Sequence, residues 1–284
     1  MHADRIEQAP HARVVRIQPR RGLGSLGVGE LWAWRELVTF LIWRDIKVRY
    51  KQTALGGAWA VIQPVMTMLV FSLFFGKLAK LSSDSVPYPV FSFAAILPWN
   101  LFSTGLTGAA GSLVGNTGLL KKVYLPRLAI PIGAVLAVVV DFLVAFVILI
   151  AMMAWYRISP SIEALLVIPF TLLAIVSALG VGIWLAALNV KYRDVKYVLP
   201  FLVQLWMFAT PVAYSSSLIT KPWAHTVFAI NPMVAVVDGF RYSLLGAPPP
   251  SLGTVCTSTA VALVALLAGL LYFRSTERTF ADVI

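Results

Sequence analysis

Long uncharged stretches alternate with short basic segments along most of this 284-residue chain. Several of the apolar stretches exceed the roughly 20 residues that a helix needs to cross the hydrocarbon core of a bilayer. We predict six membrane-spanning helices, at residues 58–79, 91–116, 128–155, 163–188, 198–219 and 252–273. The second and fifth contain prolines, so we expect both to be irregular. The pattern predicts an all-α integral membrane protein.

A different periodicity precedes the first predicted span. From residue 30 to residue 52, apolar side chains recur at helical spacing and form a stripe made of Leu31, Trp34, Val38, Leu41 and Ile42. Charged residues interrupt this stripe too often for a spanning helix, so we predict an amphipathic helix that lies in the membrane interface. Gly56 and Gly57 follow, and we expect them to let the chain turn into the first span.

These patterns divide the chain into three parts. Residues 1–29 are predicted to be a mobile cytoplasmic arm, residues 30–55 an amphipathic interfacial helix, and residues 56–284 a six-span transmembrane domain. Residues 213–247, between the fifth and sixth spans, are half apolar and are interrupted by prolines and a glycine. We predict one or two short re-entrant helices that dip into the outer leaflet, with an ordinary external loop as the alternative.

The distribution of charge predicts the orientation. Of the 23 Lys and Arg, ten precede the first span, three lie between the second and third spans, three lie between the fourth and fifth, and two follow the last span. These 18 share one side. The positive-inside rule then places both termini in the cytoplasm. The net charge of +11 does not predict a nucleic-acid partner, because its cations are scattered among apolar runs and form no solvated basic face.

Few residues suit catalysis or metal binding. The chain has no G-x-x-x-x-G-K-[ST] loop for ATP, and its three histidines show no metal-ligand spacing. Asp141 is the one acid deep within a predicted span. A single carboxylate is a poor catalytic centre, so we expect a conduit rather than an enzyme. Asp141 contacts a polar cargo, serves as a coupling element, or joins helices through a Tyr, Trp or Asn.

Two spans carry mixed polar and aromatic positions at helical spacing. They are Trp59, Gln63, Thr67, Phe71 and Phe74 in the first span, and Phe201, Gln204 and Phe208 in the fifth. Aromatic faces and amide or hydroxyl groups together suit a sugar, so these positions are candidates for lining a channel. Ordinary packing between helices is the alternative.

The basic end of the interfacial helix contains a candidate phosphate contact. Asp45 and Arg49 are four residues apart and continue the line of the apolar stripe. Such a pair either neutralises itself or meets an anionic lipid headgroup. Because arginine binds phosphate through two nitrogens, Arg49 is the candidate, while membrane orientation explains the other cations.

Four separated motifs carry a resemblance to a known family: "RDIKVRYKQTALGGAWAVIQP", "LLKKVYLPR", "ALNVKYRDVKYVLPFLVQLWMFATPV" and the final "ERTFADVI". They resemble the membrane subunit of polysaccharide-exporting ABC transporters, most of all O-antigen exporters, with capsule and teichoic-acid exporters related. The resemblance runs from about residue 30 to the end of the chain. Residues 1–28 show no motif of this family.

The resemblance implies a homodimeric permease in the bacterial inner membrane that works with two copies of a separate ATPase. ATP and Mg would bind the partner, and no cofactor would bind this chain. The cargo would be a polysaccharide on an undecaprenyl-diphosphate lipid. Leu55 and Gly56 match the loop beside the gate through which that lipid enters. The segment that couples to the ATPase is matched by Lys121, Lys122, Tyr124, Pro126 and Arg127.

Two other classes of protein fit parts of the sequence. An ion-coupled secondary transporter predicts paired charges at mid-membrane and inverted repeats, whereas one acid and no convincing repeat are found. A membrane-embedded glycosyl- or acyltransferase needs several acids or histidines at the membrane surface, and the basic loops lack them.

Overall fold

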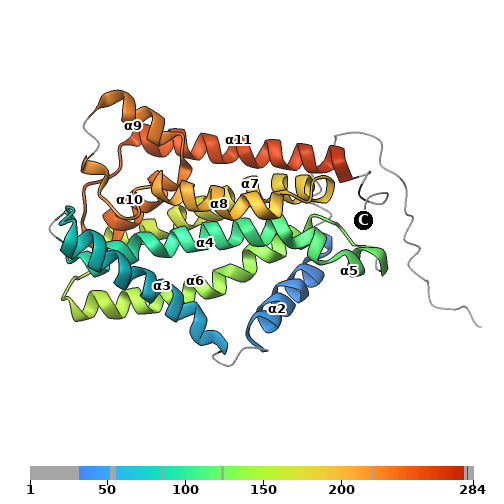
Figure 1. Ribbon diagram of the computed structural model, residues 1–284, viewed down its shortest axis with the longest axis horizontal. Helices are drawn as coiled ribbons and strands as arrows, with labels where there is room; N and C mark the ends of the chain where they lie inside the picture. The colour runs from blue at the N-terminus through green and yellow to red at the C-terminus, as the bar shows by residue number, and fades with distance from the viewer. Residues whose placement is uncertain are drawn as a thin grey trace, which may run out of the picture.

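The computed structural model describes residues 32–51, 56–84, 86–122, 125–218, 221–277 and 280. Predictions made for the arm of residues 1–29, for Leu55 and for Tyr124 lie outside these described residues. Every regular element in the described part is helical (Figure 1), which confirms the predicted all-α class.

Five described segments are long and apolar enough to cross a membrane. The first, Gly56–Leu78, consists of a short 3₁₀ turn, helix α3 (Trp59–Phe71) and a π-helical end (Ser72–Leu78). The others are α4 (Tyr88–Gly115), α6 (Ala129–Trp155), the segment Ile162–Lys191 that contains α7 (Val167–Lys191), and α11 (Leu252–Thr276). They match five of the six predicted spans.

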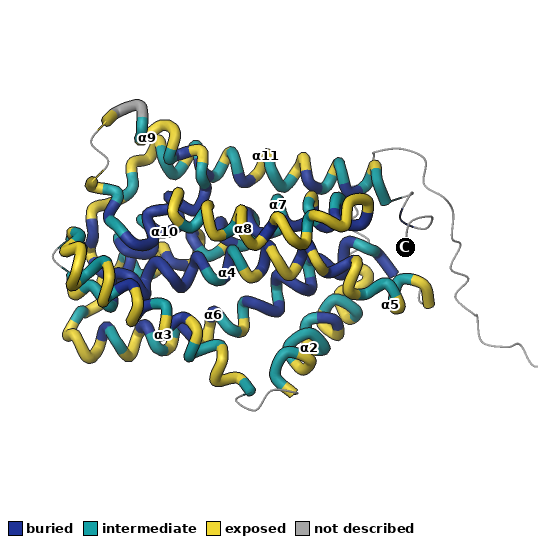
Figure 2. The backbone as a smooth tube through the Cα atoms, in the orientation of Figure 1, coloured by how far each residue is buried: buried dark blue, intermediate teal, exposed yellow. Residues whose placement is uncertain are grey.

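Helix α4 is the centre of the bundle and packs against α3, α6, α7 and α10 (Pro232–Leu245). Every residue from Val90 to Trp99 is buried (Figure 2). The irregularity predicted for this span is not found, because α4 continues through Pro98 as one helix. A proline is tolerated in such a helix where neighbouring elements enclose it.

Helices α7 and α11 approach closely at a pair of glycines. A methyl group on Gly269 would lie only 2.4 Å from the carbonyl oxygen of Gly180. A methyl group on Gly180 would lie 2.7 Å from the backbone nitrogen of Leu266. Small residues allow this contact, which drives helix association where lipid supplies no hydrophobic force.

The fifth predicted span is not confirmed as a full membrane helix. Helix α8 (Val195–Phe208) has 14 residues, which at 1.5 Å per residue is about 21 Å, less than the ~30 Å of a bilayer core. The chain then forms a turn, in which the carbonyl oxygen of Ala213 accepts a hydrogen bond from Tyr88 at the start of α4. Helix α8 follows the end of α7, which packs beside the end of α4, and the turn contacts the start of α4, so helix and turn together extend along α4.

Helix α2 (Arg35–Lys51) lies against α6. Leu41 is 1% exposed, and its Cβ would be 3.3 Å from a methyl group on Gly133. The predicted membrane-facing stripe is therefore wrong at its centre, because Val38 and Leu41 face the bundle. Small Gly133 gives α2 a surface to pack on. The exposed apolar side chains of α2 include Phe40 and Trp43, and Trp32 just before the helix is exposed as well.

Two short helices confirm the helical prediction for residues 213–247: α9 (Pro222–Ala229) and α10. Asn231 caps α10, because its side-chain oxygen accepts the amide of Met233 at 3.0 Å. Gly246 ends the helix with φ +68°, a left-handed conformation that favours glycine. Helix α10 is buried against α4, α7 and α11 rather than exposed as an ordinary loop.

The basic loops share one end of the bundle. A hydrophobic cluster joins Leu113 near the end of α4, Leu125 after α5 (Thr117–Lys122), Val190 near the end of α7 and Phe273 near the end of α11. Figure 1 shows α5 and the end of α11 at this end, and α9 and α10 at the other. The two loops that carry predicted cytoplasmic cations therefore lie together.

Candidate functional site

A cleft of about 350 Å³ opens at the corner where α2 leads into the first span. Gly56 lies at this corner with φ +50°, in the left-handed region that a side chain would strain. The cleft is lined by α2, α3, α4 and α6, and its polar or aromatic side chains include Arg49, Trp59, Gln63, Asn100, Thr104 and Asp141. Five positions predicted from the sequence to be functional thus lie in one cleft: Arg49, Gly56, Trp59, Gln63 and Asp141.

Two neighbouring residues of α2 hold the carboxylate of Asp141. Arg49 Nη1 donates to Asp141 Oδ2 and forms an ion pair with it, and the Tyr50 hydroxyl donates to Oδ1. The side chain of Arg49 is 35% exposed and that of Asp141 is 19% exposed. Asp141 therefore joins α6 to the last turn of α2 through a tyrosine, one of the partners that the sequence left open.

Tyr50 remains a hydrogen-bond donor at physiological pH. Burial raises the pKa of Tyr50 to about 12, and its hydrogen bond to the Asp141 carboxylate adds to the rise. Two donors, one cationic and one neutral, consequently point at a single anion inside the cleft.

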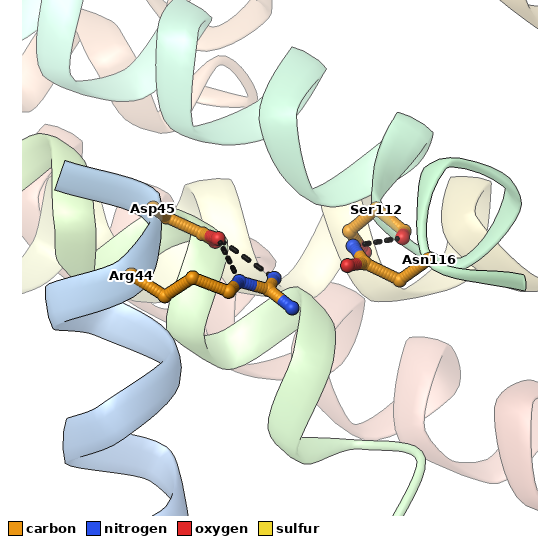
Figure 3. Close-up of polar contacts among 4 residues, drawn as sticks. All are labelled: Arg44, Asp45, Ser112 and Asn116. Carbon is orange, nitrogen blue, oxygen red and sulfur yellow. Dashed lines mark hydrogen bonds and ion pairs between the residues drawn. The ribbon is translucent and has the colours of Figure 1, made fainter. Parts of the chain in front are cut away.

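Asp45 does not pair with Arg49, which was one of the two predicted arrangements. Its Oδ1 accepts from Arg44 instead, at 3.0 Å from Nε and 2.7 Å from Nη2 (Figure 3). Arg44 can reach the neighbouring carboxylate by folding back along α2, which leaves Arg49 to extend toward α6. The contact between Arg49 and a lipid phosphate stays a prediction.

The aromatic positions of the first span and α8 divide into exposed and buried ones. Exposed side chains include Trp59 (50%), Phe74 (54%), Phe201 (61%) and Phe208 (54%), and Gln63 and Gln204 are exposed as well. Thr67 is partly exposed, and its hydroxyl donates to the Gln63 carbonyl at 3.0 Å. Phe71 differs, because its ring is 8% exposed and packs edge-to-face on Phe75 with centroids 5.2 Å apart. The structure thus gives Phe71 a packing contact inside the single chain.

The segment predicted to couple to an ATPase begins at a capped corner. The side-chain amide of Asn116 donates to the Ser112 backbone carbonyl at 2.8 Å (Figure 3). The backbone carbonyl of Asn116 accepts the amide of Leu119 at 3.0 Å. Lys121 and Lys122 are exposed at the end of α5. The corner therefore joins α5 to α4 by direct hydrogen bonds and presents two cations to solvent.

The second half of that segment contacts the end of the chain. Pro126 is buried, and Arg127 donates to the carbonyl of Glu277. The Arg127 guanidinium also lies 5.7 Å from the ring centroid of Phe280. Arg127 thus connects the loop to the segment that follows α11, a contact that spacing along the sequence did not predict.

Comparison with known proteins identifies the family. Residues 36–245, from α2 to the end of α10, match the model of a family described as ABC-2 type transporter. The chain belongs to the ABC-2 type transporter family. This family assignment agrees with the multi-pass architecture of five apolar helices in the described residues.

Named relatives of this ABC-2 transporter chain cover most of its length. It is 30% identical over 259 residues to an O-antigen export system permease protein RfbA of Myxococcus xanthus, covering 90% of this chain and 98% of the relative. An RfbA protein of Klebsiella pneumoniae is 25% identical over 207 residues, 72% of this chain and 79% of the relative. The polysialic acid transport protein KpsM of Escherichia coli is 26% identical over 249 residues, 84% and 93% respectively.

A second cleft of this ABC-2 transporter chain, of about 260 Å³, lies at the α9–α10 end and was missed by the sequence analysis. Asp84, Asp238 and Arg241 line it together with Ser215, Ser216 and Ser217. Ser215 donates to Asp84 at 2.6 Å, and Ser216 donates to both oxygens of Asp238 at 2.8 and 2.6 Å. Burial raises the pKa of the Asp238 carboxyl, while the bonds from Ser216 and the charge of Arg241 oppose that rise.

Arg241 is buried beneath this second cleft, with 2% exposure. Its guanidinium donates to the carbonyls of Pro211 (2.6 Å), Val212 (2.8 Å), Tyr214 (3.0 Å) and Phe91 (3.4 Å). It also lies 3.6 Å from the ring centroid of Phe91. Burial lowers the pKa of Arg241 to about 10, so it remains a cation at neutral pH. Arg241 therefore ties α10 to the turn after α8.

Sequence patterns contained partial signals for the residues that were missed. Asn100 and Thr104 are polar residues four apart within the apolar α4, which places them on one face of the helix. Asp238 and Arg241 are three apart in a half-apolar segment, a spacing that also shares one helical face. Neither spacing says which helices oppose that face, so the clefts themselves required the structure.

Proposed function

We propose that this chain is the membrane-spanning permease of an ABC exporter that moves a lipid-linked polysaccharide, O-antigen on undecaprenyl diphosphate, across the bacterial inner membrane. The similarity to O-antigen export permeases, over 90% and 72% of this chain, supports the cargo class. The observation that carries the proposal is the α2–α3 cleft, where a guanidinium, an indole and an amide face one space. Such groups suit a phosphate joined to sugars.

The permease works as a homodimer in this proposal. The aromatic and apolar sides of the first span and α8 stay exposed among the residues that the structure describes, and two copies facing each other would enclose a conduit between them. Rings at Trp59, Phe74, Phe201 and Phe208 would offer sugars several weak contacts. Weak contacts suit transport, because tight binding at one site would stall the cargo.

A separate ATPase partner supplies the energy, as it does for other export permeases of this family. ATP and Mg bind that partner, and the end of the bundle that carries α5 contacts it from the cytoplasm. Because Asn116 fixes α5 to α4, a push on α5 moves the central helix of the bundle. Both chain termini lie on this cytoplasmic side in the proposal, in agreement with the positive-inside count.

Reconstitution with the partner ATPase tests the proposal. The complex is placed in proteoliposomes, and movement of lipid-linked polysaccharide is followed with ATP or with a proton gradient. We expect transport with ATP alone, and expect K121Q/K122Q to reduce it about fivefold or more because the contact with the ATPase is lost. K77Q/K80Q is the matched control, since it removes two exposed lysines at the opposite end.

Each arm of this experiment has a defined meaning. Transport driven by a proton gradient without the ATPase would replace the proposal with an ion-coupled secondary transporter. Equal loss of transport in both lysine pairs would show that α5 has no special role in coupling.

A further inference from the structure

The carboxylate of Asp141 occupies the two donors that α2 directs into the α2–α3 cleft. Arg49 binds one of its oxygens and Tyr50 binds the other. These donors are adjacent in the sequence and lie in the last turn of α2, just before the corner at Gly56. One side chain of α6 thus restrains the point where the chain turns into the membrane.

The same two donors are suited to a phosphate. A guanidinium and a hydroxyl directed at two oxygens of one anion form charge-assisted hydrogen bonds equally well with carboxylate or phosphate. Arg49 keeps 35% of its side chain exposed in the cleft, so a second anion can approach it. The Asp141 carboxylate therefore accepts the same hydrogen bonds from Arg49 and Tyr50 that a phosphate ligand would accept.

The cleft also offers other partners to a displaced carboxylate. Gln63 and Asn100 carry amide donors and Thr104 carries a hydroxyl, and all three line the same space as Asp141. A carboxylate within a span needs such partners, because an unpaired one is costly in a membrane. Asp141 can therefore leave Arg49 without losing every hydrogen-bond donor.

We propose that Asp141 is an internal competitor for the phosphate site: it occupies Arg49 and Tyr50 while the cleft is empty, and a phosphate or diphosphate ligand must displace it. The inference rests on the phosphate role of Arg49 in the proposed function. Displacement breaks the link between α6 and the last turn of α2, so ligand binding frees the corner that leads into α3. Binding at the cleft and movement of α2 are thereby joined in one exchange of partners.

Binding to the purified permease tests this exchange without transport or ATPase. The full chain is placed in phosphatidylcholine nanodiscs and titrated with farnesyl diphosphate or inorganic pyrophosphate. We expect D141N to lower the apparent Kd of farnesyl diphosphate about tenfold, because the competing charge is removed. R49Q should weaken binding, and R49Q/D141N should match R49Q, because the effect of Asp141 acts through Arg49.

D45N is the matched control, since Asp45 pairs with Arg44 on the same helix. It should leave the affinity unchanged. Tighter binding of both probes to D141N assigns the site to phosphate chemistry in general, and tighter binding of farnesyl diphosphate alone assigns it to a lipid-linked phosphate. Discs that contain phosphatidylglycerol test the ordinary lipid headgroup, which would abolish the D141N effect by filling the site.

A measurement on the unmodified chain covers the case in which D141N does not assemble. Dicyclohexylcarbodiimide labels carboxyl groups within membranes, and mass spectrometry gives the extent of labelling at Asp141. Farnesyl diphosphate should increase this labelling, because it releases the carboxyl from Arg49. Labelling that stays constant or falls while the ligand binds would overturn the competition, as would an unchanged affinity in a folded D141N.

The outcomes separate this inference from the proposed function. Ligand that binds the wild type but is unaffected by D141N ends the competition and leaves the phosphate role of Arg49 intact. Ligand that binds neither form removes the phosphate site and the competition together, whereas ATP-driven transport is tested independently in proteoliposomes.

Discussion

Arg241 and Arg49 both lie beside carboxylates, yet their surroundings differ. Arg241, at the α9–α10 end, is 2% exposed and donates to four backbone carbonyls while it lies against the ring of Phe91. Arg49, at the α2–α3 corner, is 35% exposed and pairs with one movable side chain, Asp141. The first guanidinium has its partners in the backbone, and the second has a partner that can be exchanged.

The difference separates a structural arginine from a candidate binding arginine. Backbone carbonyls cannot leave without unfolding the turn that contains them, so Arg241 can release them only at the cost of the fold. A side-chain carboxylate leaves by a change of rotamer. Occupancy of the donors, rather than the residue type or its net charge, therefore decides which arginine a ligand can reach.

The largest difference in stability is expected between variants of the two arginines, R241Q and R49Q. We expect R241Q to lower the free energy of unfolding by about 3–5 kcal/mol, because four buried carbonyls lose a charged donor. R49Q should cost about 1 kcal/mol, because its site is partly exposed and Tyr50 still binds Asp141. Unfolding midpoints in one detergent give both values. Similar losses of unfolding free energy for the two variants would show that Arg49 is as much a structural residue as Arg241.

Buried and exposed rings of the first span and α8 should also differ in their effect on stability, by less than the two arginines do. F71A should lower the free energy of unfolding by about 2 kcal/mol, because Phe71 is buried in the main hydrophobic core. F74A/F208A should leave stability near wild type and slow export, because both rings are half exposed. Export rate and unfolding midpoint are measured on the same preparations.

L73A serves as the control for the exposed face, since Leu73 is 50% exposed and aliphatic. It should change neither export nor stability much. Normal export by F74A/F208A would refute the channel-lining role of these rings.

The smallest effect is expected in the cleft above Arg241. S216A removes both hydrogen bonds to Asp238, at 2.8 and 2.6 Å, and should cost about 1 kcal/mol in unfolding free energy. S82A, at an exposed serine, should cost nothing measurable. A loss from S216A as large as that from R241Q would mean that the carboxylates, rather than the carbonyls, hold Arg241.

Much of the fold could be predicted from local patterns. Five apolar runs became membrane-length helices close to their expected bounds, because run length and lack of charge are properties of the chain itself. The short α8 could not be predicted this way, since hydrophobicity continues through residue 213 while the helix ends at Phe208. Arg241 binds the carbonyls of the turn that follows α8, and it lies 27 or more residues away from that turn in the sequence.

The candidate site could be predicted only as a set of residue types. Arg49, Trp59, Gln63 and Asp141 were each selected from the sequence, and the structure brings them into one cleft. One of the two arrangements predicted for Arg49, a pair with Asp45, is not found. Helical spacing makes Asp45 a possible partner but cannot tell that α6 presents a carboxylate. The inward face of α2 was misassigned for the same reason. Leu41 packs on Gly133, which is 92 residues away in the sequence, and no local pattern or spacing links the two.

Sequence by itself determined that this chain is a helical membrane protein with basic loops on one side, because apolar length and charge are local quantities. Tertiary structure decided which stripe of α2 faces the bundle, where α8 ends and which groups hold Arg49 and Arg241. Those choices depend on small residues and polar groups that distant helices bring into contact, and no period along the chain encodes them.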